Sequence, residues 1–443
     1  ADDPDAVASL LSLHYFHANR YDEAWRYSRS AALQAKAVHA NVEAVEFYER
    51  ALTSAQLCDC VAAPELESAY EDAGDLYSRL GKYSKADSAY RFAKTCAPDQ
   101  QTQARLLLKR GQLRQRFGHY PAALRWLGKA GRLAKSIEGP AGMQLLGSTY
   151  VVVASVAKDQ ARHHDAITWC RRAIAVAGPV RDKKTLAHAY SIHDGSCSVL
   201  GRPDQAQFGD RALALYTELG DLQGQGIAHS NLGLLSIMRG QWDEGLAHWE
   251  QSQAKLRAAG DEVTVALISV NLAEARLEQG RLDEAERFLR QASRVWAAAS
   301  DRASSAYAAR LLARVEARRG EHAKALERLE QARADFEAVQ SEDEVLETSA
   351  RVAECLVLAS RPEEAFRVCT QLLDDPHDLE QFHPLLYRVL GFAYAQNGDV
   401  DAARTCFGRS LAAAEHAGTD IETAQTLRAL ARLGVVPDEE SAT

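Results

Sequence analysis

The feature that most constrains the fold is a phrase that recurs at a nearly constant interval along the chain. It begins with a turn residue, as in "GQWDEG" at Gly240 and "GRLDEA" at Gly280, and a small residue follows five positions later. In chain order the small residues are Ala86, Ala123, Ala166, Ala206, Gly245, Ala285, Ala325, Ala365 and Ala402, with spacings of 37, 43, 40, 39, 40, 40, 40 and 37. The last unit is one residue shorter between its turn and its small residue. Self-similarity at this period predicts a stack of identical supersecondary units.

A second small residue precedes each turn residue by seven positions. The set is Gly74, Gly111, Ala154, Gly233, Ala273, Ala313, Ala353 and Gly391, and Asp194 is the exception. Seven residues are nearly two helical turns, so both positions lie on one face of a helix. Small side chains on that face let a second helix approach closely. The pattern therefore predicts antiparallel helix pairs from end to end.

The residues between the paired helices agree with this reading. Glycine adopts the left-handed conformation at the end of a helix without the steric cost of a side chain. The acidic residues that follow, as in Asp243–Glu244 and Asp283–Glu284, suit the positive end of the next helix dipole. Because these carboxylate pairs recur at a structural position, we interpret them as helix-terminus residues, not as catalytic acids.

The small residue, the Gly turn and the Ala that opens the second helix resemble the tetratricopeptide repeat over residues of about 65 to 435. The resemblance implies an all-α, right-handed superhelical solenoid of ten or eleven helix pairs. The unit is longer than the length of roughly 34 residues that is usual in that family. It is similar in length to the repeats of kinesin light chain and of bacterial regulators with helical sensor arms.

The amino-terminal part has a different spacing, since its small residues Ala24 and Ala44 are only 20 apart. We therefore divide the chain into an irregular helical segment (1–62), the repeat array (63–435) and a polar tail (436–443). Residues 14–52 resemble the start of the helical-repeat arm of bacterial multidomain cyclases and STAND-type signalling ATPases. That resemblance, and the missing initiator Met, imply a fragment whose parent chain carries an N-terminal nucleotide-binding or cyclase domain.

Composition excludes several classes of function. The 61 acidic and 52 basic residues give a net charge of −9, which disfavours direct nucleic-acid binding because such proteins need a strong basic field. No apolar run reaches the roughly 20 residues that span a bilayer; the longest is Leu145–Ala157. The chain opens with acidic residues where a secretory signal would be basic. We expect a cytoplasmic protein whose eight cysteines are reduced and packed as small apolar side chains.

No pattern in the sequence predicts catalysis, a cofactor or a metal. The chain lacks the G-x-x-x-x-G-K-[ST] loop that holds nucleotide phosphates and the G-x-S-x-G nucleophile turn. Cys58 and Cys60 form a C-x-C pair without a second pair at zinc spacing. His14 and His17 are one helical turn apart but lack a Cys or carboxylate partner on the same face, and the adjacent His163 and His164 point in different directions and cannot easily share a metal. We therefore expect no enzyme.

What remains is a binding surface on the first helix of each pair. Asn231 and Asn271 lie two residues before the small residue in adjacent repeats, at the position where peptide-binding members of the repeat family hold a ligand backbone. An amide suits this role because it donates and accepts hydrogen bonds. In the next repeat Arg310, Arg314 and Arg318 form a stripe that could bind carboxylates or phosphates. The alternative is that the asparagines make helix contacts and the arginines pair with Glu316 or Glu321.

Charge blocks of opposite sign occur earlier in the chain. Glu67, Glu71 and Asp75 fall on one helix face, and the next repeat carries Arg105, Lys109 and Arg116. A groove with such blocks would select a partner by its charge pattern. We expect a non-catalytic scaffold that binds a protein or peptide in its concave groove, as the interaction arm of a bacterial signalling protein. The alternative is a small-ligand sensor domain of a signalling ATPase or transcription regulator.

Overall fold

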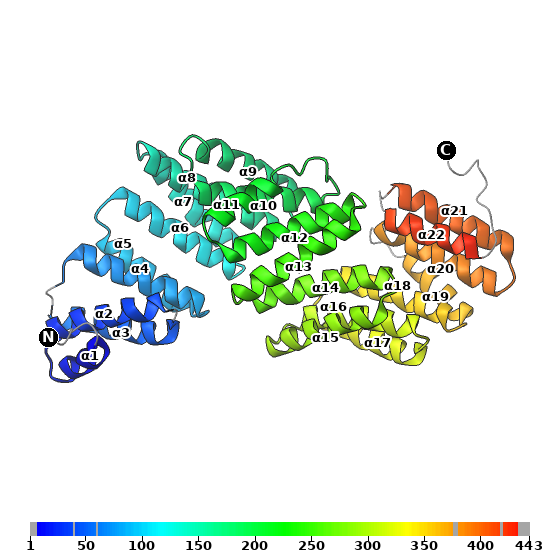
Figure 1. Cartoon of the computed structure of the whole chain (residues 1–443), viewed down its shortest axis with the longest axis horizontal. Coiled ribbons are helices and arrows are strands. Elements are labelled where there is room, and N and C mark those ends of the chain that lie inside the picture. Colours follow the sequence, from blue (N-terminus) through cyan, green and yellow to red (C-terminus); the bar gives the residue numbers. More distant parts are fainter. Residues whose placement is uncertain (1–6, 39, 59–60, 375–379, 417–419, 433–443) are drawn as a thin grey trace. The chain divides into compact units, whose positions relative to one another are not determined.

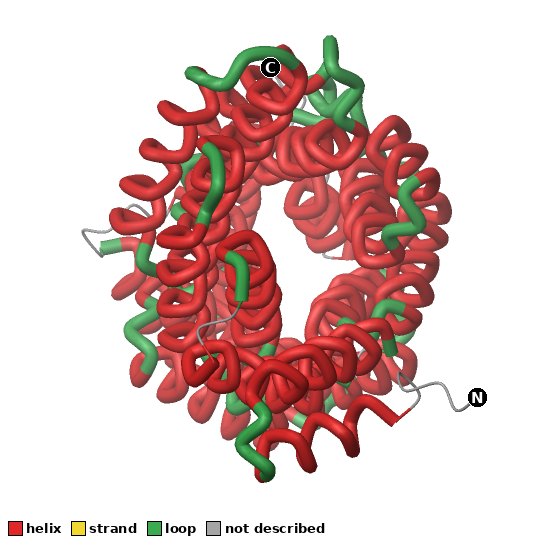
Figure 2. Tube along the Cα trace, turned by 90° about the vertical axis from the view of Figure 1, so that its left-hand side faces the viewer, coloured by secondary structure: helices red, strands yellow, loops and turns green. Residues whose placement is uncertain are grey.

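The computed structural model describes residues 7–38, 40–58, 61–374, 380–416 and 420–432, and all regular secondary structure within these ranges is helical (Figure 1). The predicted tail, residues 436–443, lies outside them. The chain divides into two compact units, Ala1–Gly224 and Gln225–Thr443, and the division falls within helix α12. In Figure 2 the helices are red tubes joined by short green loops.

The first unit contains eleven complete helices among its described residues. They are α1 (Ala8–His17), α2 (Tyr21–Ala37), α3 (Asn41–Cys58), α4 (Ala63–Arg79), α5 (Tyr83–Cys96), α6 (Gln100–Arg116), α7 (Tyr120–Lys135), α8 (Pro140–Asp159), α9 (His163–Ala177), α10 (Lys183–Val199) and α11 (Gly209–Glu218). Consecutive helices pack against each other, with the most extensive contacts inside pairs such as α4–α5, α6–α7 and α8–α9.

The second unit continues the same arrangement. Its helices are α12 (Leu222–Met238), α13 (Trp242–Ala258), α14 (Glu262–Glu278), α15 (Leu282–Ala298), α16 (Arg302–Arg318), α17 (His322–Ala338), α18 (Glu342–Leu358), α19 (Pro362–Leu373), α20 (His383–Gln396), α21 (Val400–His416) and α22 (Asp420–Arg432), with a short 3₁₀ turn, η2 (Glu380–Phe382), before α20. The predicted fold class, an all-α solenoid of antiparallel helix pairs, is confirmed within each unit.

Left-handed residues end both helices of a repeat. In the second unit they recur at a constant interval, at Gly240, Gly260, Gly280, Ser300, Gly320, Gln340 and Ser360, all with positive φ. The sequence analysis identified only every second one, the turn inside each pair. The turns five residues before Ala166 and Ala365 carry Ala161 and Ser360 in place of glycine, and both have positive φ, of 57° and 58°. From α12 to α18 each helix has 17 residues, and each helix together with its turn spans 20 residues.

The small residue before each turn accommodates a large one 16 positions later on the paired helix. A Cβ atom added to Gly74, Gly111, Gly233 or Gly391 would lie 2.5–2.7 Å from the ring or branch of Tyr90, Leu127, Trp249 or Phe407, respectively. Where the small residue is alanine, as at Ala273, Ala313 and Ala353, the residue 16 positions on is the smaller Leu289, Leu329 or Cys369. The predicted close approach of paired helices is therefore confirmed.

Two details of the predicted register need correction. In the last repeat Ala403 is 1% exposed whereas Ala402 is half-buried, so the position five after Gly398 is kept and that unit is not shortened. At the Asp194 exception the carboxylate is buried because it accepts hydrogen bonds from the backbone N–H of Phe208 (2.6 Å) and from the adjacent His193 ring (2.9 Å). Asp194 thereby holds the irregular segment that precedes the short helix α11.

The apolar segment of helix α8 is longer than was predicted from the sequence. Its full length, Pro140–Asp159, is long and apolar enough to cross a membrane, whereas the sequence analysis considered only Leu145–Ala157. In the structure α8 packs between α7 and α9, and Val152 and Val156 lie in the core with Leu127. Its apolar character is accounted for by this packing.

The cysteines largely follow the expectation of buried apolar packing. Five of the described thiols are buried: Cys170, Cys197, Cys355, Cys369 and Cys406. Burial raises the pKa of each of them, so they stay protonated at neutral pH. Cys58 departs from the expectation because it takes part in a disulfide, and Cys60 lies outside the described residues.

The register of small and large residues predicts a compensating pair of substitutions. Gly391→Ala places a Cβ against Phe407 and should lower the free energy of unfolding by about 1–3 kcal/mol. Together with Phe407→Leu it gives the Ala–Leu combination found at Ala313 and Leu329. The double variant should therefore lose less than the sum of the single variants, with a coupling energy of about 1 kcal/mol in urea denaturation. Additive losses would show that the two positions do not limit the helix approach.

Two glycine substitutions, one at a turn and one inside a helix, should have opposite effects on stability. Gly280 has a φ of 76° and open space around its Cα, so Gly280→Ala should cost about 1 kcal/mol from backbone strain alone. Gly408 lies inside α21, also with open space. Gly408→Ala should stabilise the protein by up to about 1 kcal/mol because alanine is the better helix former. Thermal denaturation distinguishes the two, and a shift of the same sign in both would contradict the assignment.

Candidate binding groove

The first helices of successive pairs form the candidate binding surface of the second unit. Helices α14, α16, α18, α20 and α22 each contact the next in this series. The series curves so far that Gln425 on α22 donates a hydrogen bond (2.9 Å) to Glu278 on α14, far away in the sequence. We call the surface between these helices the first-helix face. It corresponds to the inner face on which solenoid proteins bind partners.

Arg310, predicted as a groove residue, lies beneath this face. Its side chain is 2% exposed and forms ion pairs with Glu344 (2.6 Å) and Glu347 (3.0 Å) of α18. The guanidinium also lies over the rings of Tyr307 (5.0 Å) and Phe336 (5.5 Å). Because it is surrounded by its own repeat and the next one, Arg310 connects the two repeats.

Arg314 and Arg318 lie on the face itself and share one acidic partner. Glu278 of α14 accepts from Arg314 at 2.9 Å and from Arg318 at 3.3 Å, and Arg318 also donates to the backbone carbonyl of Leu277. Burial acts to raise the pKa of Glu278, but the two arginine charges outweigh it and lower the pKa. Within the described ranges neither arginine pairs with Glu316 or Glu321, the partners considered from sequence; those glutamates bind Lys324, and Glu316 also binds Arg328.

The structure adds Arg351 and Glu354 of α18, which the sequence analysis missed. Arg351 pairs with Glu354 at 3.0 Å, and the two line a cavity of about 20 Å³ together with Arg314 and Arg318. Burial would raise the pKa of Glu354, but the surrounding arginines, above all Arg351, lower it to about 2. The repeat period could have indicated Glu354, because Glu274, Arg314 and Glu354 occupy equivalent positions in successive repeats. Glu278 and Arg318 are equivalent to each other in the same way.

Asn271 lies at the end of the first-helix face where these ion pairs stop, and Asn231 lies on α12, the first helix of the preceding pair. Asn231 on α12 and Asn271 on α14 are both half-buried and occupy the same position in adjacent repeats. The Asn271 amide makes no hydrogen bond among the described residues. One turn before each asparagine is an exposed aliphatic side chain, Ile227 (38% exposed) or Leu267 (50% exposed). Amides and apolar side chains therefore alternate on both helices.

Glu274, one turn after Asn271, is the carboxylate of this face that lacks an ion pair within the described ranges. The charges of Arg314 and Arg310 act on it, yet Arg314 is bonded to Glu278 and Arg310 to α18. Burial raises the pKa of Glu274 despite the arginine charges that lower it.

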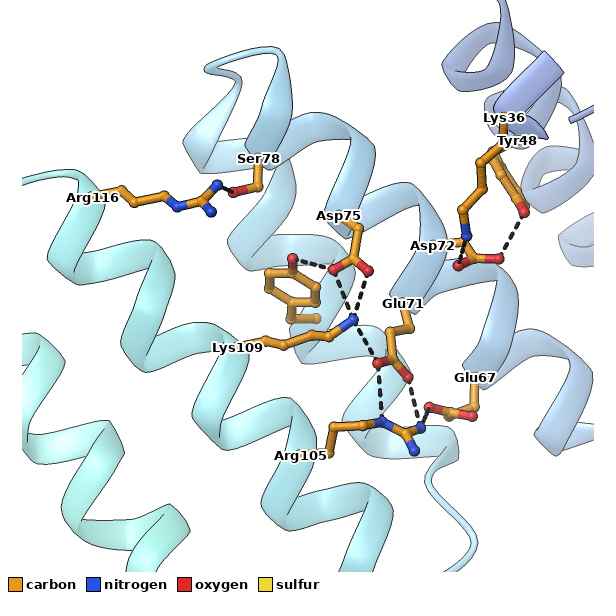
Figure 3. A network of polar contacts seen from close by, with 11 residues as sticks. Lys36, Tyr48, Glu67, Glu71, Asp72, Asp75, Ser78, Arg105, Lys109 and Arg116 are labelled. Carbon is orange, nitrogen blue, oxygen red and sulfur yellow. Dashed lines mark hydrogen bonds and ion pairs between the residues drawn. The ribbon is translucent and has the colours of Figure 1, made fainter. Parts of the chain in front are cut away.

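The charge blocks predicted in the first unit pair with each other (Figure 3). Arg105 of α6 binds Glu71 of α4 through two nitrogens (2.7 and 3.0 Å) and Glu67 at 3.2 Å. Lys109 bridges Glu71 (2.7 Å) and Asp75 (2.6 Å). Arg116, the third basic residue of the block, instead approaches Ser78 at 3.4 Å.

This network extends to three further helices that the sequence did not connect to it. Asp72 of α4 binds Lys36 of α2 (2.5 Å) and the Tyr48 hydroxyl of α3 (2.8 Å), and Tyr90 of α5 donates to Asp75 (2.7 Å). Burial and the neighbouring Glu71 raise the pKa of Glu67. The charged side chains of these blocks therefore bind one another and hold neighbouring repeats together, so little unpaired charge remains.

No group of three or more His, Cys, Asp or Glu side chains converges on a possible metal position in the described part of the chain. His163 and His164, considered from sequence, start α9, and His14 and His17 lie on α1.

Family models for the tetratricopeptide repeat match residues 67–99, 224–298, 264–338 and 384–409. No curated protein matches the chain. Among solved structures, a STAND signal-transduction ATPase with a tetratricopeptide-repeat sensor from Pyrococcus horikoshii is similar with a TM-score of 0.56 and 13% identity. The match covers 84% of this chain and 57% of that one, so the chain spans little more than half of the ATPase.

Two further structures share the fold at low identity. A Rap protein complexed with competence and sporulation factor matches with a TM-score of 0.56 and 12% identity, over 82% of this chain and 99% of that one. The apo quorum sensor NprR from B. thuringiensis matches with a TM-score of 0.50 and 13% identity, over 83% and 98%. Together with the repeated helix pairs, the family models confirm the resemblance seen in the sequence: the chain carries tetratricopeptide repeats in the matched residues, and the solved structures share its helical fold.

Proposed function

We propose that the chain is a non-catalytic scaffold of a bacterial signalling protein that binds an extended peptide, or an extended segment of a partner protein, on the first-helix face of its second unit. The observation that carries this proposal is the Asn271 amide, which is half-buried beside exposed Leu267 and has no hydrogen-bond partner in the described part of the chain. A peptide backbone offers donors and acceptors in alternation, which one amide can satisfy at once. Asn231 occupies the same position one repeat earlier.

The similar structures support this reading by analogy of fold. The Rap protein was solved with a sporulation factor and NprR is a quorum sensor, so solenoids of this type serve as regulators. The small-ligand alternative is less well supported at the first-helix face. The cavity at Arg314 and Arg351 has a volume of about 20 Å³, enough for a water molecule but far below the roughly 300 Å³ or more of small-molecule pockets.

In this proposal the three predicted arginines shape the site and do not bind the peptide themselves. Arg314 and Arg318 are neutralised by Glu278, so a carboxylate of a partner would bind them only by replacing that glutamate. Arg310 fixes the spacing of α16 and α18 beside the site. We therefore assign peptide contact to Asn231, Asn271 and Glu274, and the shape of the site to the arginines.

A positional-scanning library of short peptides tests the proposal directly. Peptides enriched by the wild-type chain should bind Asn271→Ala about 10-fold more weakly, corresponding to about 1.4 kcal/mol, in fluorescence anisotropy. Asn231→Ala should weaken binding similarly. The exposed amide of Gln251 on the second helix α13 provides the control, and Gln251→Ala should leave the affinity unchanged. Equal affinity of Asn271→Ala and wild type would refute the site.

The same library tests the charge of the partner. Wild type should prefer peptides that carry Lys or Arg at one position, because a cation there would pair with Glu274. Glu274→Gln should lose that preference while it retains binding of the neutral peptides. A preference that survives in Glu274→Gln would show that the carboxylate does not face the peptide.

Substitution of Arg310 should lower the stability more than substitution of an arginine in a surface ion pair. Arg310→Ala leaves Glu344 and Glu347 without their cation and should cost about 2–3 kcal/mol, less than a fully enclosed pair because both glutamates are about one-third exposed. Arg319 of the same repeat also has two acidic partners but lies at the surface. Arg319→Ala should cost less than about 1 kcal/mol. Equal losses in chemical denaturation would contradict the connecting role of Arg310.

A further inference from the structure

Two histidine rings meet between the first helix pair of the second unit. His229 on α12 and His248 on α13 are both half-buried, and their Nδ1 atoms are 3.0 Å apart. The ring centroids are 5.3 Å apart with planes tilted by 40°. At this distance one Nδ1 must carry a hydrogen and the other must accept it, so the pair shares a single hydrogen between two lone pairs.

The surroundings disfavour a positive charge on His229. Burial, the adjacent His248 and the charge of Lys255 all lower the pKa of His229. Neutral imidazole nitrogens are the form that binds transition-metal ions.

We propose that His229 and His248 form a binding site for a divalent transition-metal ion, which both Nδ1 atoms would bind once the hydrogen between them has moved to Nε2 of the ring that carries it. With metal–nitrogen bonds of about 2.05 Å, a nitrogen separation of 3.0 Å corresponds to an angle of about 94° at the metal. This fits two neighbouring positions of a tetragonal or octahedral ion such as Cu²⁺ or Ni²⁺. A tetrahedral ion would require the nitrogens to separate to about 3.3 Å.

The remaining ligands of such an ion are water molecules. Within the described residues no third His, Cys, Asp or Glu converges on the pair. The charge of Lys255 opposes the metal as it opposes a proton on His229, and it limits the affinity. An ion bound here would connect α12 to α13 and so stabilise the repeat that carries Asn231.

Isothermal titration of the full chain with NiCl₂ tests the site. Wild type should bind about one equivalent through this pair, and His229→Gln and His248→Gln should each raise the Kd by about 10-fold or more because a single imidazole remains. The double variant His14→Gln/His17→Gln removes the other helical histidine pair and should leave this binding unchanged. Binding that persists in both single variants, or no binding by wild type, would overturn the proposal.

Two further measurements separate metal binding from a structural role of the rings. Ni²⁺ should raise the Tm of wild type but not of His248→Gln, with apo Tm values measured for each protein. Lys255→Gln should lower the Kd for Ni²⁺, since it removes the opposing charge without touching a ligand. With Cu²⁺, the electron paramagnetic resonance signal should show two coupled nitrogens in wild type. A signal unchanged in His248→Gln would also overturn the assignment.

Discussion

The close approach of the two helices in each pair is the constraint on which the rest of the structure depends. It is made possible by a small residue seven positions before the turn, whose missing side chain leaves room for the residue 16 positions later. Gly391 and Phe407 meet in this way, as do Gly74 and Tyr90. Because the space is shared, a larger residue on one helix requires a smaller one on the other. The same helix spacing is thus maintained with Gly–aromatic and Ala–Leu combinations.

This constraint explains why the fold could be predicted from one sequence. Few residues other than glycine suit a left-handed turn, and few other than glycine and alanine suit a close contact between helices. These residues therefore recur at regular positions in the sequence. The turns at Ser300 and Gln340 were not recognised, because residues of these types adopt positive φ only where the flanking helices impose it. Asp194 was recognised only as an exception, since its hydrogen bond to Phe208 depends on a local change in chain path.

The binding surface could be predicted less completely. The spacing of Arg310, Arg314 and Arg318 correctly places them along one helix, but their partners belong to the preceding and following repeats. Which acidic residue reaches which arginine depends on the curvature of the stack, and no spacing within one helix contains that information. His229 and His248 gave no signal either, since they lie on different helices and are brought together only by the pairing of α12 with α13.

The charges of the first-helix face alternate from repeat to repeat at one register position: Glu274, Arg314, Glu354. Inside such a series each charge has opposite charges on both sides, so the face neutralises itself and offers a partner little electrostatic attraction. The series ends at α14, because the equivalent residue on α12 is the apolar Leu234. Glu274 is therefore flanked by charge on one side only, and the cation on that side is bonded elsewhere. The break in this charge series coincides with the asparagines at positions 231 and 271, where we propose the peptide site.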